Sequence, residues 1–227
     1  MFKKSLVLSL ALATALSASD LRFELGSASG DGKLKTADIV LNTGSSQSGF
    51  TTKTRLGYAK HDNGNAYRVD AVFGWQFGDA NSWGLFKIYP IGVGYTYYSS
   101  KDNFFVSYNG SSYGYVSDNL SMFTYKAGIE YQKDSLFLDK LSLLVGAFYT
   151  HTFYTTNIDE GNDNYYSDLN YKPKGFETYV GVDYGVTDKF IVGAKVGYNK
   201  FKDSSFLDES FFNHSGATFK LSVGYKF

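Results

Sequence analysis

The chain has 227 residues, including 24 Gly, 20 Tyr and 20 Phe but only 2 Pro and no Cys. The lack of cysteine excludes disulfides, thiolate metal sites and lipid attachment to a cysteine. Lys and Arg together number 22, as do Asp and Glu, so the formal charge is zero and a nucleic-acid partner is not indicated.

The start of the chain has the pattern of a secretory signal peptide. Lys3 and Lys4 precede an apolar run from Leu6 to Leu16, which small residues follow. This run is too short to cross a bilayer as a helix. We therefore expect residues 1–19 to be cleaved after Sec-type export. One domain, residues 20–227, then remains with 20 basic and 22 acidic side chains, a net charge of about −2.

Beyond this segment, apolar and polar residues alternate in run after run, which predicts β-strands with two different faces. No stretch approaches the ~18 uninterrupted apolar residues of a membrane-spanning helix, whereas membrane strands are apolar at every second residue. Nine runs are clear: residues 21–25, 52–58, 67–77, 91–97, 123–131, 141–149, 176–184, 190–198 and 219–227. Pro90 predicts either the start of the fourth of these strands or an irregularity in it.

The last run ends the chain on an aromatic residue. Its apolar side chains occupy every second position: Phe219, Leu221, Val223, Tyr225 and Phe227. A terminal Phe on such a strand resembles the assembly signal of bacterial outer-membrane β-barrels, which the insertion machinery reads in that family. Together with the signal peptide, residues 20–227 resemble small outer-membrane barrels of the OmpA, OmpX and Opa type, in the porin-like superfamily.

This resemblance implies an all-β fold, a transmembrane antiparallel up-and-down β-barrel. It also implies location in the outer membrane of a Gram-negative bacterium, with lipid, lipopolysaccharide and the insertion machinery as partners. A soluble β-sandwich or lipocalin-like barrel would alternate in the same way. Such a protein has an apolar face inward, but the nonaromatic face here is rich in Gly and charge and cannot form a dry core.

The number of strands and the orientation of the barrel in the membrane can also be predicted. Bacterial single-chain barrels have an even strand count, so a tenth strand is expected from residues 35–42 or 104–116; eight strands is the alternative. The connections 155–174 and 201–215 are long, whereas 187–189 is short. We expect the long ones to face outward and the short one to face the periplasm.

Charged residues recur on the face assigned to the lumen, and basic ones outnumber acidic ones. They are Arg22, Glu24, Lys53, Arg55, Arg68, Asp70, Lys126, Glu130, Glu177, Asp183, Lys195 and Lys220, with Lys226 at the end. One interpretation is a set of ion pairs that holds a narrow barrel together. The other is an aqueous passage that prefers anions, for which glycines such as Gly57 and Gly128 leave room. About ten strands allow at most a thin path.

No catalytic, cofactor or metal site is predicted, so we do not expect an enzyme. His214 and Ser215 are adjacent, unlike the histidine and serine of outer-membrane lipid A deacylases, which one residue separates. Nothing matches the acidic pairs of omptin proteases, and the acidic segment 157–168 lacks the spacing of a calcium loop. The other two histidines, His61 and His151, fit neither enzyme pattern.

The sequence therefore predicts an integral outer-membrane barrel with a structural or surface-interaction role, carried by long external loops that meet a protein or ligand outside. A narrow, weakly anion-preferring porin is the alternative. A lipid-modifying enzyme or protease is the distant third.

Overall fold

The computed structural model describes residues 18–29, 34–44, 47–61, 64–100, 104–108, 112–116, 119–157, 172–202 and 215–227. Its strands are β1 (Asp20–Ala28), β2 (Leu34–Asn42), β3 (Gln47–His61), β4 (Gly64–Asp79), β5 (Gly84–Ser100), β6 (Phe104–Tyr108), β7 (Ser112–Val116), β8 (Asn119–Lys133), β9 (Leu141–Asn157), β10 (Lys174–Gly185), β11 (Phe190–Lys202) and β12 (Ser215–Lys226). The signal segment up to residue 17, His214 and nearly all of the acidic segment 157–168 lie outside the described residues, so the predictions about them stay predictions.

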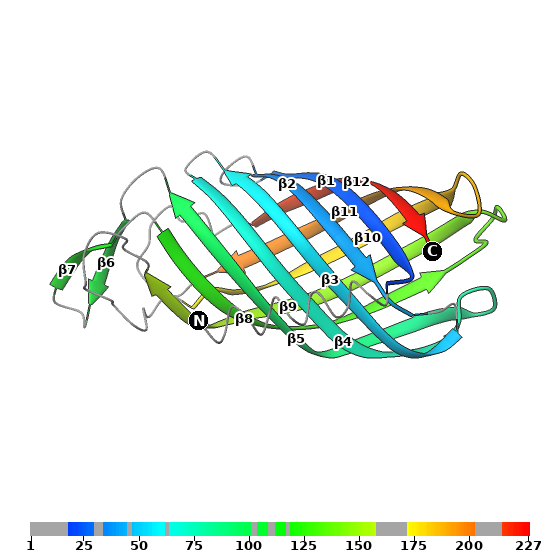
Figure 1. Ribbon diagram of the computed structural model, residues 1–227, viewed down its shortest axis with the longest axis horizontal. Helices are drawn as coiled ribbons and strands as arrows, with labels where there is room; N and C mark the ends of the chain where they lie inside the picture. Colours follow the sequence, from blue (N-terminus) through cyan, green and yellow to red (C-terminus); the bar gives the residue numbers. More distant parts are fainter. Residues whose placement is uncertain are drawn as a thin grey trace.

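Ten of these strands form one closed antiparallel barrel in the order β1-β12-β11-β10-β9-β8-β5-β4-β3-β2 (Figure 1). Every barrel strand pairs with its neighbours along the chain, β5 pairs with β8, and β1 pairs with β12 to close the ring. The predicted all-β up-and-down barrel of ten strands is thus confirmed. No helix among the described residues is long and apolar enough to cross a membrane.

The tenth strand is β2, the first of the two candidate segments. The second candidate, residues 104–116, instead forms the two-stranded hairpin β6–β7, which pairs only with itself. Figure 1 shows this hairpin beyond the end of the barrel. Both segments alternate in sequence, and only pairing with a neighbouring strand separates a barrel strand from a hairpin.

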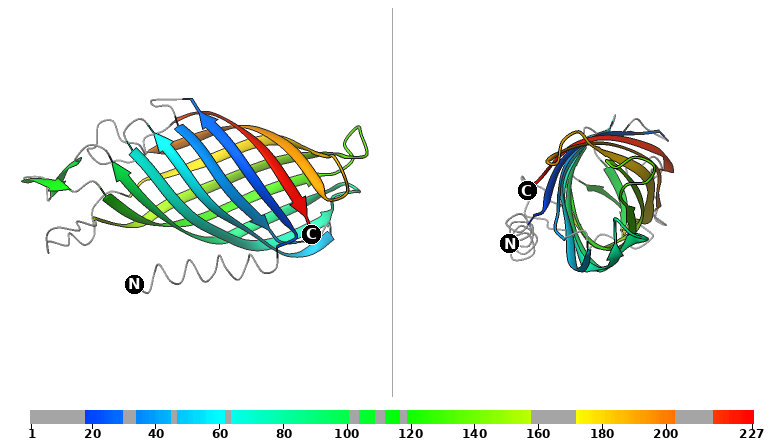
Figure 2. Two further views of the ribbon diagram at one scale, coloured as in Figure 1. Left: turned by 45° about the horizontal axis from the view of Figure 1, so that its top comes forward. Right: turned by 90° about the vertical axis from the view of Figure 1, so that its right-hand side faces the viewer.

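The two ends of the barrel differ in the length of their connections. Asp20 pairs with Lys226 at one end, and the turn at 186–189 lies beside them, because the Lys226 N–H donates to Lys189 O at 2.8 Å. Strands β9 and β11 finish at the opposite end, and residues 158–173 and 203–214 connect them to β10 and β12 (Figure 2). The predicted grouping of long and short connections at opposite ends agrees with this topology.

Pro90 lies inside β5, so it marks an irregularity and does not begin the strand. The pairing of β5 with β8 skips from Tyr89 to Val93, and its pairing with β4 skips from Phe73 to Trp75. Gly74 stands opposite this bulge, where an added Cβ would lie 1.8 Å from Ile88 O. The two backbones approach so closely here that only glycine fits.

The barrel wall carries apolar side chains outside and charged side chains inside, the reverse of a soluble protein. Ile129 is 58% exposed on the outer wall, whereas Glu24 and Asp38 are 1% and 0% exposed inside. The outer wall carries many more large apolar side chains, among them Phe23, Leu25, Ile39, Phe77, Ile91, Val180, Val192, Val196, Phe219, Leu221 and Val223. This apolar belt rules out the soluble alternative, which needs its apolar side chains inside.

Candidate functional site in the barrel lumen

Ion pairs fill the lumen and link strands far apart in sequence. Lys53 Nζ lies 2.5 Å from Glu130 Oε1. Lys126 Nζ lies 3.1 Å from Asp70 Oδ1. Alternation directs Lys126 and Glu130 inward, because their neighbours Tyr125 and Ile129 are exposed on the outer wall. The contacts cross the interior between β3 and β8 and between β4 and β8, so side chains brace the barrel in addition to its backbone ladders.

All twelve residues assigned to the lumen take part in such pairs. In addition to those above, Lys195 Nζ lies 2.5 Å from Glu24 Oε1, Arg55 Nη1 lies 3.5 Å from Glu177 Oε2, and Lys220 Nζ lies 3.4 Å from Glu177 Oε1. Arg68 Nη2 donates to both carboxylate oxygens of Asp38, at 2.7 and 2.8 Å. Arg22 donates to Asp183 and to Asp20.

Sequence reasoning missed three charged residues of the interior: Asp20, Asp38 and Lys87. With them, the inward charges are eight basic (Arg22, Lys53, Arg55, Arg68, Lys87, Lys126, Lys195, Lys220) and seven acidic (Asp20, Glu24, Asp38, Asp70, Glu130, Glu177, Asp183). Lys226 is exposed at the barrel end. The predicted excess of basic residues therefore nearly vanishes, which is a correction. Alternation could have found Asp38, since it lies between Ala37 and Ile39 on an alternating run, but that run had not been assigned as a strand.

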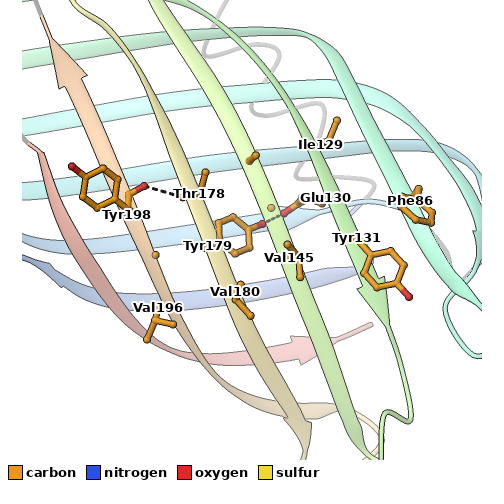
Figure 3. Close-up of a pocket in the computed structure, with 13 residues that line it drawn as sticks. Phe86, Ile129, Glu130, Tyr131, Val145, Thr178, Tyr179, Val180, Val196 and Tyr198 are labelled. Atoms are coloured by element: carbon orange, nitrogen blue, oxygen red, sulfur yellow. Dashed lines mark hydrogen bonds between the residues drawn. The ribbon is translucent and has the colours of Figure 1, made fainter.

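Aromatic rings occupy the middle of the lumen beside these charges. Tyr89 and Phe148 have ring centroids 5.8 Å apart, and Phe148 stacks on Tyr179 at 6.5 Å. The Tyr179 hydroxyl donates to Glu130, and Lys53 Nζ lies 3.2 Å from that hydroxyl. We call Lys53, Glu130, Phe148 and Tyr179 the central layer. Figure 3 shows Tyr179 and Glu130 pointing toward one another from β10 and β8.

The lumenal glycines do not leave the open space that the sequence suggested. A Cβ on Gly128 would lie 2.2 Å from Phe148 Cδ1, and one on Gly57 would lie 2.5 Å from Arg68 Nε. The side chains of neighbouring strands therefore take up the room that each glycine vacates. The expectation that Gly57 and Gly128 make space for water is wrong for this reason.

The remaining voids run in series along the lumen. A chamber of about 320 Å³ lies at the end that holds Asp20 and Lys226, and a chamber of about 170 Å³ lies in the half with Leu34 and Phe201. Voids of only about 40 and 10 Å³ separate them, and Lys53 and Tyr179 line both. The smaller void holds no more than about one water molecule, so the central layer divides the lumen.

The outer wall bears a separate apolar hollow of about 520 Å³ over β8 to β11. Figure 3 shows Ile129, Tyr131, Val145, Val180, Val196 and Tyr198 around it. The small residues Gly146 and Ala147 also line it. The hollow is part of the apolar belt, whose surface is made to meet hydrocarbon.

The five residues predicted as an assembly signal lie along β12 and at the end of the chain. Phe219, Leu221, Val223 and Phe227 are exposed on the outer wall, and the Tyr225 ring meets Phe227 edge-on at 5.4 Å. The Phe227 N–H donates to Ser19 O at 3.0 Å, which holds the end of the chain against β1.

Two of the three histidines, His61 and His151, lie in the described part of the chain. His61 is buried, and His151 lies 3.5 Å from the Tyr149 hydroxyl on the outer wall. Within the described parts of the chain, no group of three or more His, Asp, Glu or Cys residues is placed to hold a metal ion.

Comparisons with known proteins return solved outer-membrane structures. No family model and no curated protein matches the chain. It is similar to the translocator domain of autotransporter NalP from Neisseria meningitidis (11% identity, 99% of this chain, 96% of that chain, TM-score 0.48). It is also similar to the transport unit of autotransporter AIDA-I from Escherichia coli (14%, 96% and 97%, 0.44) and to the NanC porin (11%, 91% and 100%, 0.41). At such identities a shared kind of fold does not carry an activity from one protein to another.

Proposed function

We propose that this chain is an integral outer-membrane β-barrel with a closed lumen, and that its role is noncatalytic, in surface structure or surface interaction. The apolar belt supports the membrane location, because exposed side chains such as Phe23, Val180 and Leu221 on a closed barrel suit hydrocarbon. The closed ring also leaves no unpaired strand edge, which a bilayer does not tolerate.

Topology supports the orientation of this barrel in the membrane. The end where Asp20 pairs with Lys226 faces the periplasm in this proposal, since short turns collect there. The long connections 158–173 and 203–214 then face outward and carry the contact with an external protein or ligand. Lys174 and Lys200, exposed on the outer wall near that end, would meet lipopolysaccharide phosphates.

The observation that carries the closed lumen is the central layer. Lys53, Glu130 and Tyr179 bond to one another, and Phe148 stacks on Tyr179 beside them. The voids at this layer, which separate the two chambers, measure only about 40 and 10 Å³ and hold no more than a few water molecules. A hydrated ion cannot pass without moving these side chains.

A conductance measurement tests whether the lumen is closed. The mature chain, residues 20–227, is refolded into a planar lipid bilayer, and its folded state is verified in the same preparation. We expect no reproducible current steps. Stable steps from a verified barrel would overturn the closed lumen and favour the second candidate, a narrow porin, which the chambers of about 320 and 170 Å³ on either side of the central layer support.

The surface role has its own experiment. Deletion of residues 158–171 shortens an expected external loop while leaving β9 and β10 intact. We expect loss of binding to cells or matrix and an unchanged barrel. Equal binding by a folded deletion variant would contradict the assignment of the role to this loop.

A further inference from the structure

The apolar hollow in the outer wall, which we call the wall hollow, follows from the sizes of neighbouring side chains. Thr178 on β10 stands opposite Ala147 on β9, and the larger Ile129 and Tyr198 flank these two on β8 and β11. All four line the hollow of about 520 Å³ (Figure 3). The Thr178 hydroxyl donates to Tyr198 O at 3.3 Å, so it is already paired. In a bilayer, hydrocarbon fills such a depression, because an empty one forfeits dispersion contacts.

Two exposed lysines lie on the outer wall beside the wall hollow. Lys200 follows Tyr198 by two residues on β11, about 7 Å farther toward the long connections. Phe176 stands opposite Lys200, and Lys174 lies two residues from Phe176 along β10. The two lysines are therefore diagonal neighbours on one face, with Cα atoms roughly 7–8 Å apart. Their flexible stems allow both ammonium groups to reach one ligand group.

No acidic side chain of the four strands around the wall hollow cancels this charge. The acidic residues of β8 to β11 are Glu130, Glu177 and Asp183, and all three form ion pairs inside the lumen. His151, which stands opposite Lys174, adds no negative charge. Among the described residues, the outer wall beside the hollow thus carries two positive charges without an acidic partner.

Strand length places these lysines at the level of lipid headgroups. From Lys174 to Tyr184, β10 rises by about 33 Å along its own axis, and a tilt of about 45° reduces this to a height of about 23 Å. The apolar band of an outer-membrane barrel is about 25 Å tall. Lys174 therefore lies near one edge of the hydrocarbon, whereas Thr178 and the wall hollow lie within it. Two lysines suit a phosphate monoester, which carries a charge of about −1.5 to −2 at pH 7.

We propose that the wall hollow and the two lysines together bind one anionic lipid, with an acyl chain in the hollow and a phosphate monoester on Lys174 and Lys200. The proposal rests on the membrane location proposed above and adds a preference for one class of lipid. A zwitterionic lipid also fills the hollow, but its own ammonium group already neutralises its phosphate. The preference therefore comes from the lysines, and the hollow fixes where the lipid lies.

Tryptophan fluorescence in lipid vesicles tests this site. The only tryptophans of the chain are Trp75 and Trp83. Replacing both with Phe and adding Tyr198→Trp gives one reporter at the wall hollow. Trp83→Phe alone keeps Trp75, which is 55% exposed on β4, as a reporter of lipid elsewhere on the wall. Phosphatidic acid and phosphatidylcholine with the same brominated acyl chains are the probes, because bromine quenches a tryptophan that it contacts.

We expect phosphatidic acid to bind beside the Tyr198→Trp reporter about fivefold or more better than phosphatidylcholine, and both lipids to quench Trp75 equally. Lys174→Gln with Lys200→Gln should abolish the preference. The matched control is Lys35→Gln with Lys60→Gln, because these exposed lysines stand opposite each other on β2 and β3, away from the wall hollow. This control should keep the preference.

A second pair of variants tests the hollow without changing charge. Ala147→Phe fills the wall hollow and should lower the preference at the Tyr198→Trp reporter by at least about half. Ala194→Phe adds the same ring on β11 outside the lining of the hollow and should leave the preference in place.

Three outcomes would overturn the proposal. The first is equal quenching of the Tyr198→Trp reporter by both lipids. The second is an equal loss of preference in the two double lysine variants, which would indicate general attraction of anionic lipid to the barrel. The third is an unchanged preference in Ala147→Phe, which would remove the hollow from the site. A chain that does not fold into vesicles contradicts the membrane location itself, whereas a folded barrel without lipid preference contradicts only this site.

Discussion

Lys195 Nζ lies 2.5 Å from Glu24 Oε1, and this contact reaches over β12 to join β11 to β1. The two strands share no backbone hydrogen bonds, since β12 stands between them. The pair therefore reinforces the seam where the first and last strands of the chain close the barrel. Both side chains are almost fully buried, at 10% and 2% exposure.

Neutralising Glu24 should destabilise the barrel because Lys195 would remain charged in a buried place. We expect Glu24→Gln to lower the free energy of unfolding by roughly 3 kcal/mol. Urea-induced unfolding from lipid vesicles measures this change. Adding Lys195→Met should recover much of the loss, and Asp188→Asn in the exposed turn should change stability by less than about 0.5 kcal/mol. Equal stability of Glu24→Gln and Asp188→Asn would show that the pair does not hold the seam.

Two glycines in neighbouring strands give a matched pair of substitutions. A Cβ on Gly74 would lie 1.8 Å from the backbone oxygen of Ile88, whereas one on Gly49 would meet nothing within 4 Å. We expect Gly74→Ala to prevent refolding or to shift the pairing of β4 with β5, and Gly49→Ala to refold normally. Refolding yield in vesicles decides between them. A normal yield for Gly74→Ala would mean that the bulge at Pro90 can relax.

Features that depend on neighbouring residues in the chain could be predicted from the sequence, whereas the pairing of distant segments could not. The nine alternating runs all became strands, because a period of two residues fixes which side chains share a face. Residues 35–42 and 104–116 could not be ranked, since alternation does not say which strand will pair with which. Only the three-dimensional pairing of β2 with β1 and β3 settled that question.

Contacts between side chains inside the barrel also could not be predicted, because they join residues far apart in the chain. The inward direction of Lys53 and Glu130 follows from the faces of their strands, but their contact joins positions 77 residues apart and depends on the register around the whole barrel. The role of Gly128 was misjudged for a related reason. The ring that fills its space, Phe148, comes from the adjacent strand β9, which the sequence of β8 alone does not reveal.

The membrane location can be tested with two valines of similar exposure. Val180 on the barrel wall is 49% exposed and Val186 in the turn after β10 is 53% exposed. We expect Val180→Lys to cost about 2–4 kcal/mol in vesicles, because it places a charge in hydrocarbon, and Val186→Lys to cost no more than about 1 kcal/mol at the interface. A water-exposed barrel would accept both equally. Equal unfolding free energies of the two variants would therefore contradict the proposed membrane belt.

The aromatic part of the central layer should decide whether the lumen conducts. Tyr179 and Phe148 stack with centroids 6.5 Å apart between the two chambers. Replacing both with Ala removes most of the apolar filling and should join the chambers through a wetted path, so we expect small current steps where the unmodified chain is silent. Tyr149→Ala with Tyr198→Ala is the matched control, because it removes two aromatic rings from the outer wall.

The double substitution at Phe148 and Tyr179 costs packing energy, about 3–5 kcal/mol for each ring in a tight core. Folding of every variant is therefore checked before recording, and Phe148→Ala alone serves if the double variant does not refold. Steps in the inner variant and silence in the outer control would assign the barrier to the rings. Silence from a folded inner variant would contradict this assignment and leave the Lys53–Glu130 pair, at 2.5 Å, as the barrier to ions.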